Sequence, residues 1–152
     1  MGTFSITRDI MIAAPRERVY ALVDDLREWE RWSPWEALDP SMSHEYTGPD
    51  RGVGARHCWV GNKDAGEGEM LITDSSPDGV SLDLHFVKPF RAQNAVRIGL
   101  EEVDAGTRAV WTMTGRQNPL MKVLFAVMRV ENRLGKDFER GLAQLKAQAE
   151  LT

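Results

Sequence analysis

Apolar residues near the end of the chain recur at helical spacing. From Leu120 to about Glu150 there is no proline, and large apolar side chains fall three or four positions apart. This pattern is typical of one amphipathic helix, about 45 Å long at about 1.5 Å per residue. Its apolar stripe consists of Leu120, Leu124, Val127, Met128, Leu134, Phe138, Leu142 and Leu145. Such a helix must bury this stripe against another large element.

Most of the chain before this helix alternates between apolar and polar residues, as half-buried strands do. The first predicted strand is Phe4–Ala13, and two short helices follow it, one beginning at Pro15 and one covering residues 26–35. Six further strands are separated by turns rich in glycine, proline and aspartate; we place them at 42–47, 55–60, 67–74, 80–88, 91–103 and 107–115. Short turns favour antiparallel neighbours, so we expect an α+β domain.

The strands also show which side of the sheet is buried. One face is apolar in four of the strands, and its rows are residues 68, 70 and 72, then 82, 84 and 86, then 96, 98 and 100, and finally 109, 111 and 113. The opposite face carries mostly polar and charged side chains. This division predicts an antiparallel sheet that is covered on one face only, with the long helix as the cover.

Composition narrows the class of protein. The 152 residues are 42% hydrophobic and 28% charged, which suits a single globular domain spanning 1–152. The net charge of −4 comes without a basic run, so no nucleic-acid partner is expected. A lone cysteine, Cys58, excludes an internal disulfide framework and fits a reducing compartment. With no signal-peptide pattern and no apolar run long enough to span a bilayer, we predict a cytoplasmic protein without membrane insertion.

Several short motifs resemble one known family. They are Ala13-Ala14-Pro15, Trp29-Glu30-Arg31-Trp32-Ser33-Pro34-Trp35, Gly52-Val53-Gly54, Trp59-Val60-Gly61-Asn62, Lys88-Pro89-Phe90 and Gly135-Lys136-Asp137-Phe138-Glu139. These motifs, and the order in which they follow one another along the chain, resemble the polyketide cyclase/dehydrase branch of the START-like (SRPBCC, birch-pollen-allergen-like) superfamily. The resemblance implies a helix-grip fold, in which a seven-stranded curved antiparallel sheet wraps around the C-terminal helix. It also implies a cavity between sheet and helix, and no cofactor.

Residues in the inward phase are the candidates for a ligand wall. Flexible methionines and flat aromatic rings suit a cavity that adapts to its guest, although the same residues also build ordinary cores. The predicted ligand-binding set is Trp35, Tyr46, His57, Trp59, Met70, Leu84, Phe86, Trp111, Met113, Leu124, Met128 and Glu131.

Glu131 is the most distinctive member of this set. It falls between Met128 and Leu134 on the apolar stripe of the predicted helix, where its carboxylate would face the sheet. Such a group could anchor a ligand hydroxyl or act as a general acid or base. The alternative is that Glu131 lies at the edge of the stripe and reaches solvent, or pairs with Arg8.

Two histidines are the other candidates for chemistry. If the turn through residues 48–54 is symmetric, His44 and His57 lie opposite each other across a hairpin. Pointing inward, they could donate to a carbonyl or transfer a proton. The sequence shows no third ligand at useful spacing, so we predict no metal site. The alternative role is structural, with both rings satisfied by water or backbone.

Three functions are compatible with these observations. The first is binding, transport or sensing of a small hydrophobic molecule such as a polyketide, lipid or aromatic metabolite. The second is a cyclase or dehydratase in the same cavity, with Glu131, His44 and His57 as catalytic candidates. The third is a protein-interaction module with a vestigial pocket. Apolar residues around Val123 and Phe125 would then form a partner surface, a homodimer contact or the lid of a pocket.

Overall fold

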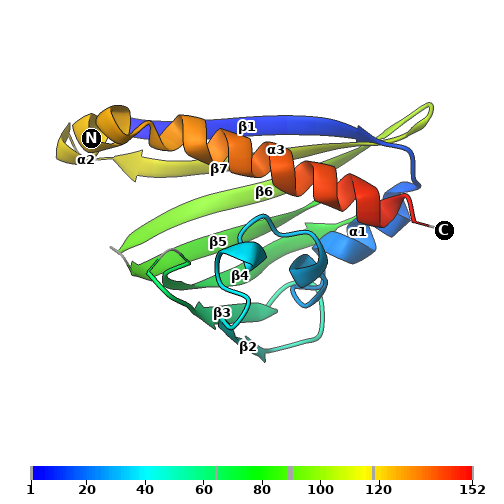
Figure 1. Cartoon of the computed structure of the whole chain (residues 1–152). Helices are drawn as coiled ribbons and strands as arrows, with labels where there is room; N and C mark the ends of the chain where they lie inside the picture. Colours follow the sequence, from blue (N-terminus) through cyan, green and yellow to red (C-terminus); the bar gives the residue numbers. More distant parts are fainter. Residues whose placement is uncertain (1, 64, 89–90, 118, 152) are drawn as a thin grey trace.

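One antiparallel sheet curves along the C-terminal helix in the computed structural model, which describes residues 2–63, 65–88, 91–117 and 119–151 (Figure 1). The side chains of residues 2, 37, 117 and 125 lie outside this description, so the prediction for Phe125 is not addressed. The seven strands are β1 (Gly2–Ile12), β2 (Ser43–Thr47), β3 (Arg56–Val60), β4 (Glu67–Ser76), β5 (Gly79–Lys88), β6 (Ala92–Val103) and β7 (Gly106–Gln117). Their order in the sheet is β1-β7-β6-β5-β4-β3-β2.

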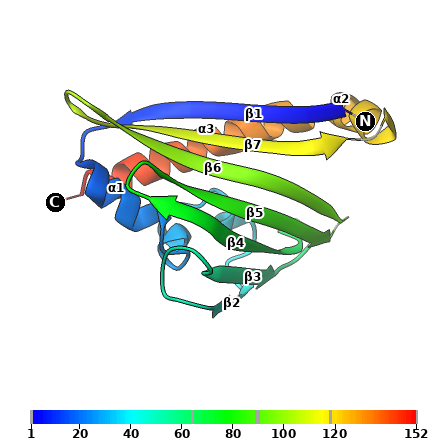
Figure 2. The ribbon, with the colours of Figure 1, turned by 180° about the vertical axis from the view of Figure 1, so that it is seen from behind.

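All described helices cover the same face of this sheet. Seen from behind, the strands lie in front of the helices (Figure 2). The helical elements are α1 (Arg16–Val23), the 3₁₀ turns η1 (Glu28–Arg31) and η2 (Glu36–Leu38), α2 (Pro119–Met128) and α3 (Val130–Ala149). Pro15 precedes α1, and its carbonyl accepts hydrogen bonds from the amides of Arg18 and Val19. The expected α+β helix-grip fold, with short helices between the first two strands, is therefore confirmed.

The C-terminal helix is not continuous, so the prediction of one helix from Leu120 onward is wrong. Arg129 adopts a left-handed conformation, with φ 54° and ψ 43°, and separates α2 from α3. Its amide closes a turn onto the carbonyl of Ala126. Neither glycine nor proline marks this position, and the apolar repeat continues across it, so the sequence pattern could not show the break. No described helix is both long and apolar enough to cross a membrane.

Aromatic side chains fill the space between α3 and the middle of the sheet. The rings of Trp111 on β7 and Phe138 on α3 stack with centroids 4.3 Å apart, and Trp29 and Trp32 meet the Trp111 ring edge-on. The indole N–H groups of Trp29 and Trp32 donate to carbonyls of α1. This cluster buries four large rings and closes the interior at this level of α3.

Gly141 allows α3 to approach this cluster closely. A Cβ atom at this position would lie 2.8 Å from ring atoms of both Pro34 and Trp111. Six residues earlier, Gly135 faces the guanidinium of Arg8 instead. Gly141 therefore determines how near α3 lies to the sheet, whereas the neighbour of Gly135 is the end of a flexible side chain.

Candidate functional site: a cavity and a polar cluster

A cavity of about 1040 Å³ lies between the sheet and the junction of α2 with α3. Strands β1, β5, β6 and β7 and both helices contribute to its wall, which includes Phe4, Phe86, Asn94, Met113, Met121 and Leu134. The cavity begins where the aromatic cluster ends. There the β7 residues that face the helix are Met113 and Gly115, whose side chains fill less space than that of Trp111 in the cluster. Half of the eighteen lining residues are polar or charged, but most of the surface that the cavity exposes is apolar, as in sites that take hydrophobic molecules.

Asp137 places a polar group at the wall of this cavity. One of its oxygens accepts a hydrogen bond of 3.2 Å from the indole Nε1 of Trp35, and the other accepts one of 3.1 Å from Arg140. Both contacts hold the carboxylate in a defined orientation. The cavity therefore combines apolar surface with a fixed hydrogen-bond acceptor.

A second, smaller hollow of about 590 Å³ lies along β3, β4 and β5. It includes Cys58, Trp59 and His85, and it shares Phe86 and residues 91–93 with the larger cavity. The ring of Trp59 meets that of Phe86 edge-on, with centroids 6.0 Å apart. Phe86 therefore lies between the two spaces.

Three rings on β2 and β3 stack beside this hollow, and the ring of Trp59 lies next to them at a tilt. Tyr46 pairs with His57 in the sheet, and their rings are nearly parallel, with centroids 4.7 Å apart. His44 stacks on both of these rings, and Trp59 lies 5.9 Å from His57. The symmetric hairpin that would set His44 directly opposite His57 is not formed, because His44 pairs with Trp59. The two histidines are diagonal neighbours.

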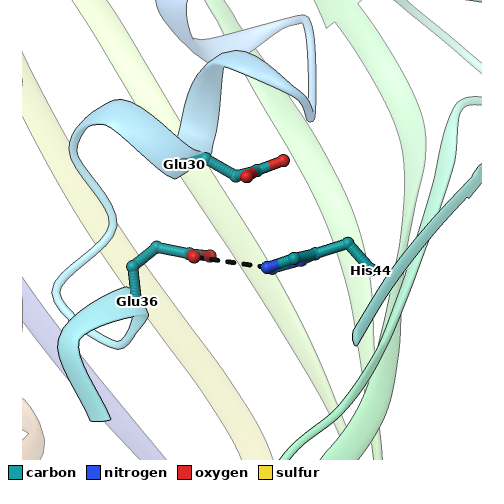
Figure 3. A group of neighbouring side chains, drawn as sticks. All are labelled: Glu30, Glu36 and His44. Atoms are coloured by element: carbon teal, nitrogen blue, oxygen red, sulfur yellow. Dashed lines mark ion pairs between the residues drawn. The ribbon is translucent and has the colours of Figure 1, made fainter. Parts of the chain in front are cut away.

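Polar contacts connect these rings to two carboxylates of the 3₁₀ turns, and Figure 3 shows Glu30, Glu36 and His44 with the ion pair between Glu36 and His44. His44 Nδ1 lies 2.8 Å from His57 Nε2, and His44 Nε2 lies 3.3 Å from a carboxylate oxygen of Glu36. The hydroxyl of Tyr46 donates to Glu30. His57 is only 6% exposed, and its Nδ1 atom is buried without a hydrogen-bond partner among the described residues. We refer to Glu30, Glu36, His44, Tyr46 and His57 as the polar cluster.

Burial shifts the ionisation of this polar cluster. It lowers the pKa of His57 to about 4, and a positive charge on His44 acts in the same direction, so His57 is neutral at pH 7. Burial also raises the pKa of the Glu36 carboxyl, against the attraction of His44. The pKa of Tyr46 is raised by burial and by its hydrogen bond to Glu30, which keeps this hydroxyl protonated as a donor.

The predicted ligand-binding residues are distributed over several environments. Trp59, Phe86 and Met113 line the two hollows, whereas Tyr46 and His57 belong to the polar cluster. The remaining inward residues, Trp35, Met70, Leu84 and Trp111, belong to or pack against the core.

Three predicted site residues lie on the outside: the expected inward orientation is wrong for Leu124 and Met128, and for Glu131 the alternative of a solvent-exposed side chain is confirmed. Leu124 and Met128 are each 47% exposed on α2, and Glu131 is exposed in the first turn of α3. The break at Arg129 ends the continuous stripe that placed all three against the sheet. Arg8 pairs with Glu139, at 3.9 Å, and not with Glu131.

Several residues of the site were not expected from the sequence. Asp137 follows Leu134 by three positions, so its place on the inner side of α3 could have been found from helical spacing. Glu30 and Glu36 gave no such signal, because only the path of η1 and η2 over the edge of the sheet brings them to His44. The spacing of residues in the sequence, which showed no third ligand for the two histidines, therefore did not reveal these two carboxylates.

Comparisons with known proteins agree with this architecture. The sequence matches a family model described as "Polyketide cyclase / dehydrase and lipid transport" over residues 3–150. No curated protein matches the sequence significantly. The fold is similar to that of the di-domain ARO/CYC BexL from the BE-7585A biosynthetic pathway, with 21% identity and a TM-score of 0.71 over 99% of this chain and 51% of that one.

Two further solved structures share the fold over nearly their whole length. Ara h 8.0201 has 13% identity and a TM-score of 0.67, with 97% of this chain and 98% of that chain covered. The Aha1 dimer from Colwellia psychrerythraea has 16% identity and the same TM-score of 0.67, with 97% of each chain covered. At these identities, the similarity establishes the fold alone.

Proposed function

Because the chain belongs to the polyketide cyclase/dehydrase and lipid transport family, we propose that it binds a small hydrophobic molecule between its sheet and the α2–α3 junction. The observation that carries this proposal is the cavity of about 1040 Å³. Sites for small molecules usually measure about 300–1,000 Å³, are mostly apolar and hold a few oriented polar groups. The apolar wall and the oriented Asp137 carboxylate fit this description.

The expected guest is a largely apolar molecule with at least one hydrogen-bond donor. Burial of about 250 Å² of apolar ligand surface would contribute about 6 kcal/mol, from which the costs of association are subtracted. A hydroxyl or amine of the guest could donate to Asp137, while Arg133, which also lines the cavity, could meet an acidic group. Polyketides, fatty acyl compounds and isoprenoids with such groups are all suitable.

Access to the cavity would be controlled by α2. This helix contributes Met121 to the cavity wall, while Leu120, Val123 and Val127 are 62–78% exposed. The left-handed residue Arg129 connects α2 to the more firmly packed α3. We assign α2 the role of a lid, with Arg129 as its hinge.

The exposed side of α2 also supports a second candidate role, contact with another protein or a homodimer. Five apolar side chains on one short helix are at least 47% exposed: Leu120, Val123, Leu124, Val127 and Met128. Exposed apolar patches of this kind often mark interaction sites. Sedimentation of the protein and of a Val123→Glu, Val127→Glu variant would separate the two roles, because only a dimer contact predicts a concentration-dependent mass that the variant loses.

Binding is favoured over catalysis by the residues at the cavity. Among the described residues, none of the histidines lines the larger cavity, and Glu131 is exposed on the outside. A cyclase or dehydratase needs an acid or base within hydrogen-bond reach of its substrate. Asp137 is the candidate for such a role, but both of its oxygens already accept hydrogen bonds, from Trp35 and from Arg140.

A fluorescence titration with 1-anilinonaphthalene-8-sulfonate tests the binding proposal. The variant Leu134→Asp places a charge in the cavity wall and should weaken probe binding at least tenfold. Leu151→Asp is the matched control, because it makes the same change at a leucine that is 63% exposed and lies outside the cavity lining. Circular dichroism confirms that both variants fold. Equal affinity of a folded Leu134→Asp protein and the wild type would refute the proposed site.

A further inference from the structure

Three side chains from separate elements direct metal-ligand atoms into one space at the edge of the sheet. Glu30 comes from η1, Glu36 from η2 and His44 from β2, and their ligand atoms all lie within 4.8 Å of one another (Figure 3). We propose that Glu30, Glu36 and His44 form a binding site for a divalent first-row transition-metal ion, with Zn²⁺ or Co²⁺ as suitable ions. This site is separate from the hydrophobic cavity and does not depend on it.

The donor set favours such an ion. Two carboxylate oxygens and one imidazole nitrogen suit Zn²⁺, Co²⁺ or Mn²⁺, whereas Ca²⁺ and Mg²⁺ prefer oxygen ligands alone. The distance of 3.3 Å between His44 Nε2 and Glu36 Oε2 is close to the ~3.4 Å that separates two ligands of a tetrahedral zinc ion. Glu30 is exposed, so its carboxylate can move the remaining ~1.5 Å without repacking the core. Three protein ligands leave a fourth position for water.

A second layer of hydrogen bonds supports these ligands. Metal-binding histidines usually place their other ring nitrogen against a hydrogen-bonding group, which orients the ring. His44 meets this condition, because its Nδ1 lies 2.8 Å from Nε2 of the buried His57. Tyr46 donates to Glu30 and stacks on His57, so one packed ring orients a carboxylate ligand while the other orients the imidazole.

The charge of the site also favours a cation. Among the described residues, neither Glu30 nor Glu36 forms an ion pair with a lysine or arginine. Arg27 lies over the ring of Tyr46, but its ion pair is with Asp50. A divalent ion between the two carboxylates would balance both of their negative charges, whereas a protonated His44 would balance only one of them.

Metal binding would change the position of one proton in His57. In the metal-free tautomer in which His44 Nε2–H donates to Glu36, His44 Nδ1 would accept from His57 Nε2–H, and the buried His57 Nδ1 would carry a lone pair. With metal on His44 Nε2, the His44 proton lies on Nδ1 and is donated to His57 Nε2. The proton of His57 then lies on its own Nδ1.

Titration of the tag-free, full-length protein with Co²⁺, followed by visible absorption, and with Zn²⁺, followed by calorimetry, tests the site. We expect one ion per chain, and at least 100-fold weaker binding in His44→Gln and in Glu36→Gln. Tyr46→Phe removes only the hydroxyl that orients Glu30 and should weaken binding about 10- to 100-fold. His85→Gln is the matched control, because it removes a histidine outside the polar cluster.

Nitrogen-15 NMR of the histidine rings adds a readout that a merely structural cluster would not change. Zn²⁺ should shift the His44 Nε2 signal and move the His57 proton from Nε2 to Nδ1. If His44→Gln fails to fold, Glu36→Gln and Tyr46→Phe carry the test, with circular dichroism as the folding control. Absence of stoichiometric binding, or equal affinity in folded Glu36→Gln and His85→Gln proteins, would refute the metal site. Either result leaves the probe titration of the hydrophobic cavity unchanged.

Discussion

A single methyl group added to α3 should have opposite effects at its two buried glycines. In Gly141→Ala the new Cβ would lie 2.8 Å from Pro34 Cδ and 2.8 Å from Trp111 Cζ3, and both of these atoms belong to packed rings. In Gly135→Ala it would lie 2.2 Å from Nη2 of Arg8, the far end of a flexible side chain. Alanine is the better helix former at both positions, so the difference between the variants reports the surroundings.

The expected magnitudes follow from these contacts. Alanine in place of glycine inside a helix contributes about 1 kcal/mol. At Gly141 the rings cannot withdraw, and overpacking costs about 2–3 kcal/mol, which leaves the variant destabilised by about 1–2 kcal/mol. At Gly135 the Arg8 head group can rotate away, losing its contact with Glu139 at 3.9 Å, an exposed pair that contributes at most about 1 kcal/mol. Gly135→Ala should therefore be neutral or slightly more stable than the wild type.

Urea denaturation followed by tryptophan fluorescence measures both variants under the same conditions. For a chain of this size, a loss of 1 kcal/mol lowers the melting temperature by about 2–4 °C, so the difference is also visible in a thermal scan. The probe titration on Gly141→Ala shows whether moving α3 away from Trp111 alters the cavity. A Gly141→Ala protein as stable as Gly135→Ala would refute the conclusion that this glycine sets the distance between helix and sheet.

Three other predictions concern single positions. Burial lowers the pKa of His57 from 6.5 to about 4, so as the pH falls the unfolded state binds a proton before the folded state does. The free energy of unfolding contributed by neutral His57 should therefore be fully present above pH 6.5 and fall by up to about 3 kcal/mol towards pH 4, as measured by urea titrations. His57→Gln should reduce this loss. Arg129→Gly should leave the free energy of unfolding unchanged or raise it by up to about 1 kcal/mol, because glycine adopts the left-handed conformation without strain. The same replacement within α2, Ala126→Gly, should instead lower the free energy of unfolding by about 1 kcal/mol. Burial and then the Glu69 carboxylate raise the pKa of the Cys58 thiol, so its reaction with Ellman's reagent at pH 8 should be slower than that of free cysteine and faster in Glu69→Gln.

The strands and their pairing with the next strand in sequence could be predicted because their determinants are local, whereas the curved sheet closed by the pairing of β1 with β7 was implied only by the family resemblance. Alternation of apolar residues identifies the strands, and the turns between them are short, so neighbours in sequence became neighbours in the sheet. Helical spacing correctly placed Phe138, Leu142 and Leu145 in the core. The same spacing misplaced Leu124, Met128 and Glu131, since it assumes that the helix axis continues through Arg129.

The site was harder to predict because its parts meet only through the tertiary fold. Glu30 and Glu36 lie on irregular 3₁₀ turns, where no periodicity indicates which way a side chain points. The hydrogen bond between His44 and His57 depends on a hairpin register two residues away from the symmetric one. Which inward residues line a void and which fill the core depends on where the Trp111–Phe138 stack ends.

The pairing of the first strand with the last has a consequence for biosynthesis. Every β1 residue from Gly2 to Ile12 pairs in the sheet with a β7 residue between Thr107 and Gln117. The ribosome must therefore extend the chain by about a hundred residues before β1 can pair with β7. During that interval the N-terminal segment has no partner strand, and its apolar side chains stay exposed. Chaperones recognise such exposed apolar segments, which also aggregate readily. Translation speed and chaperone supply, and not only the stability of the finished protein, should therefore govern the yield of folded material in a cell.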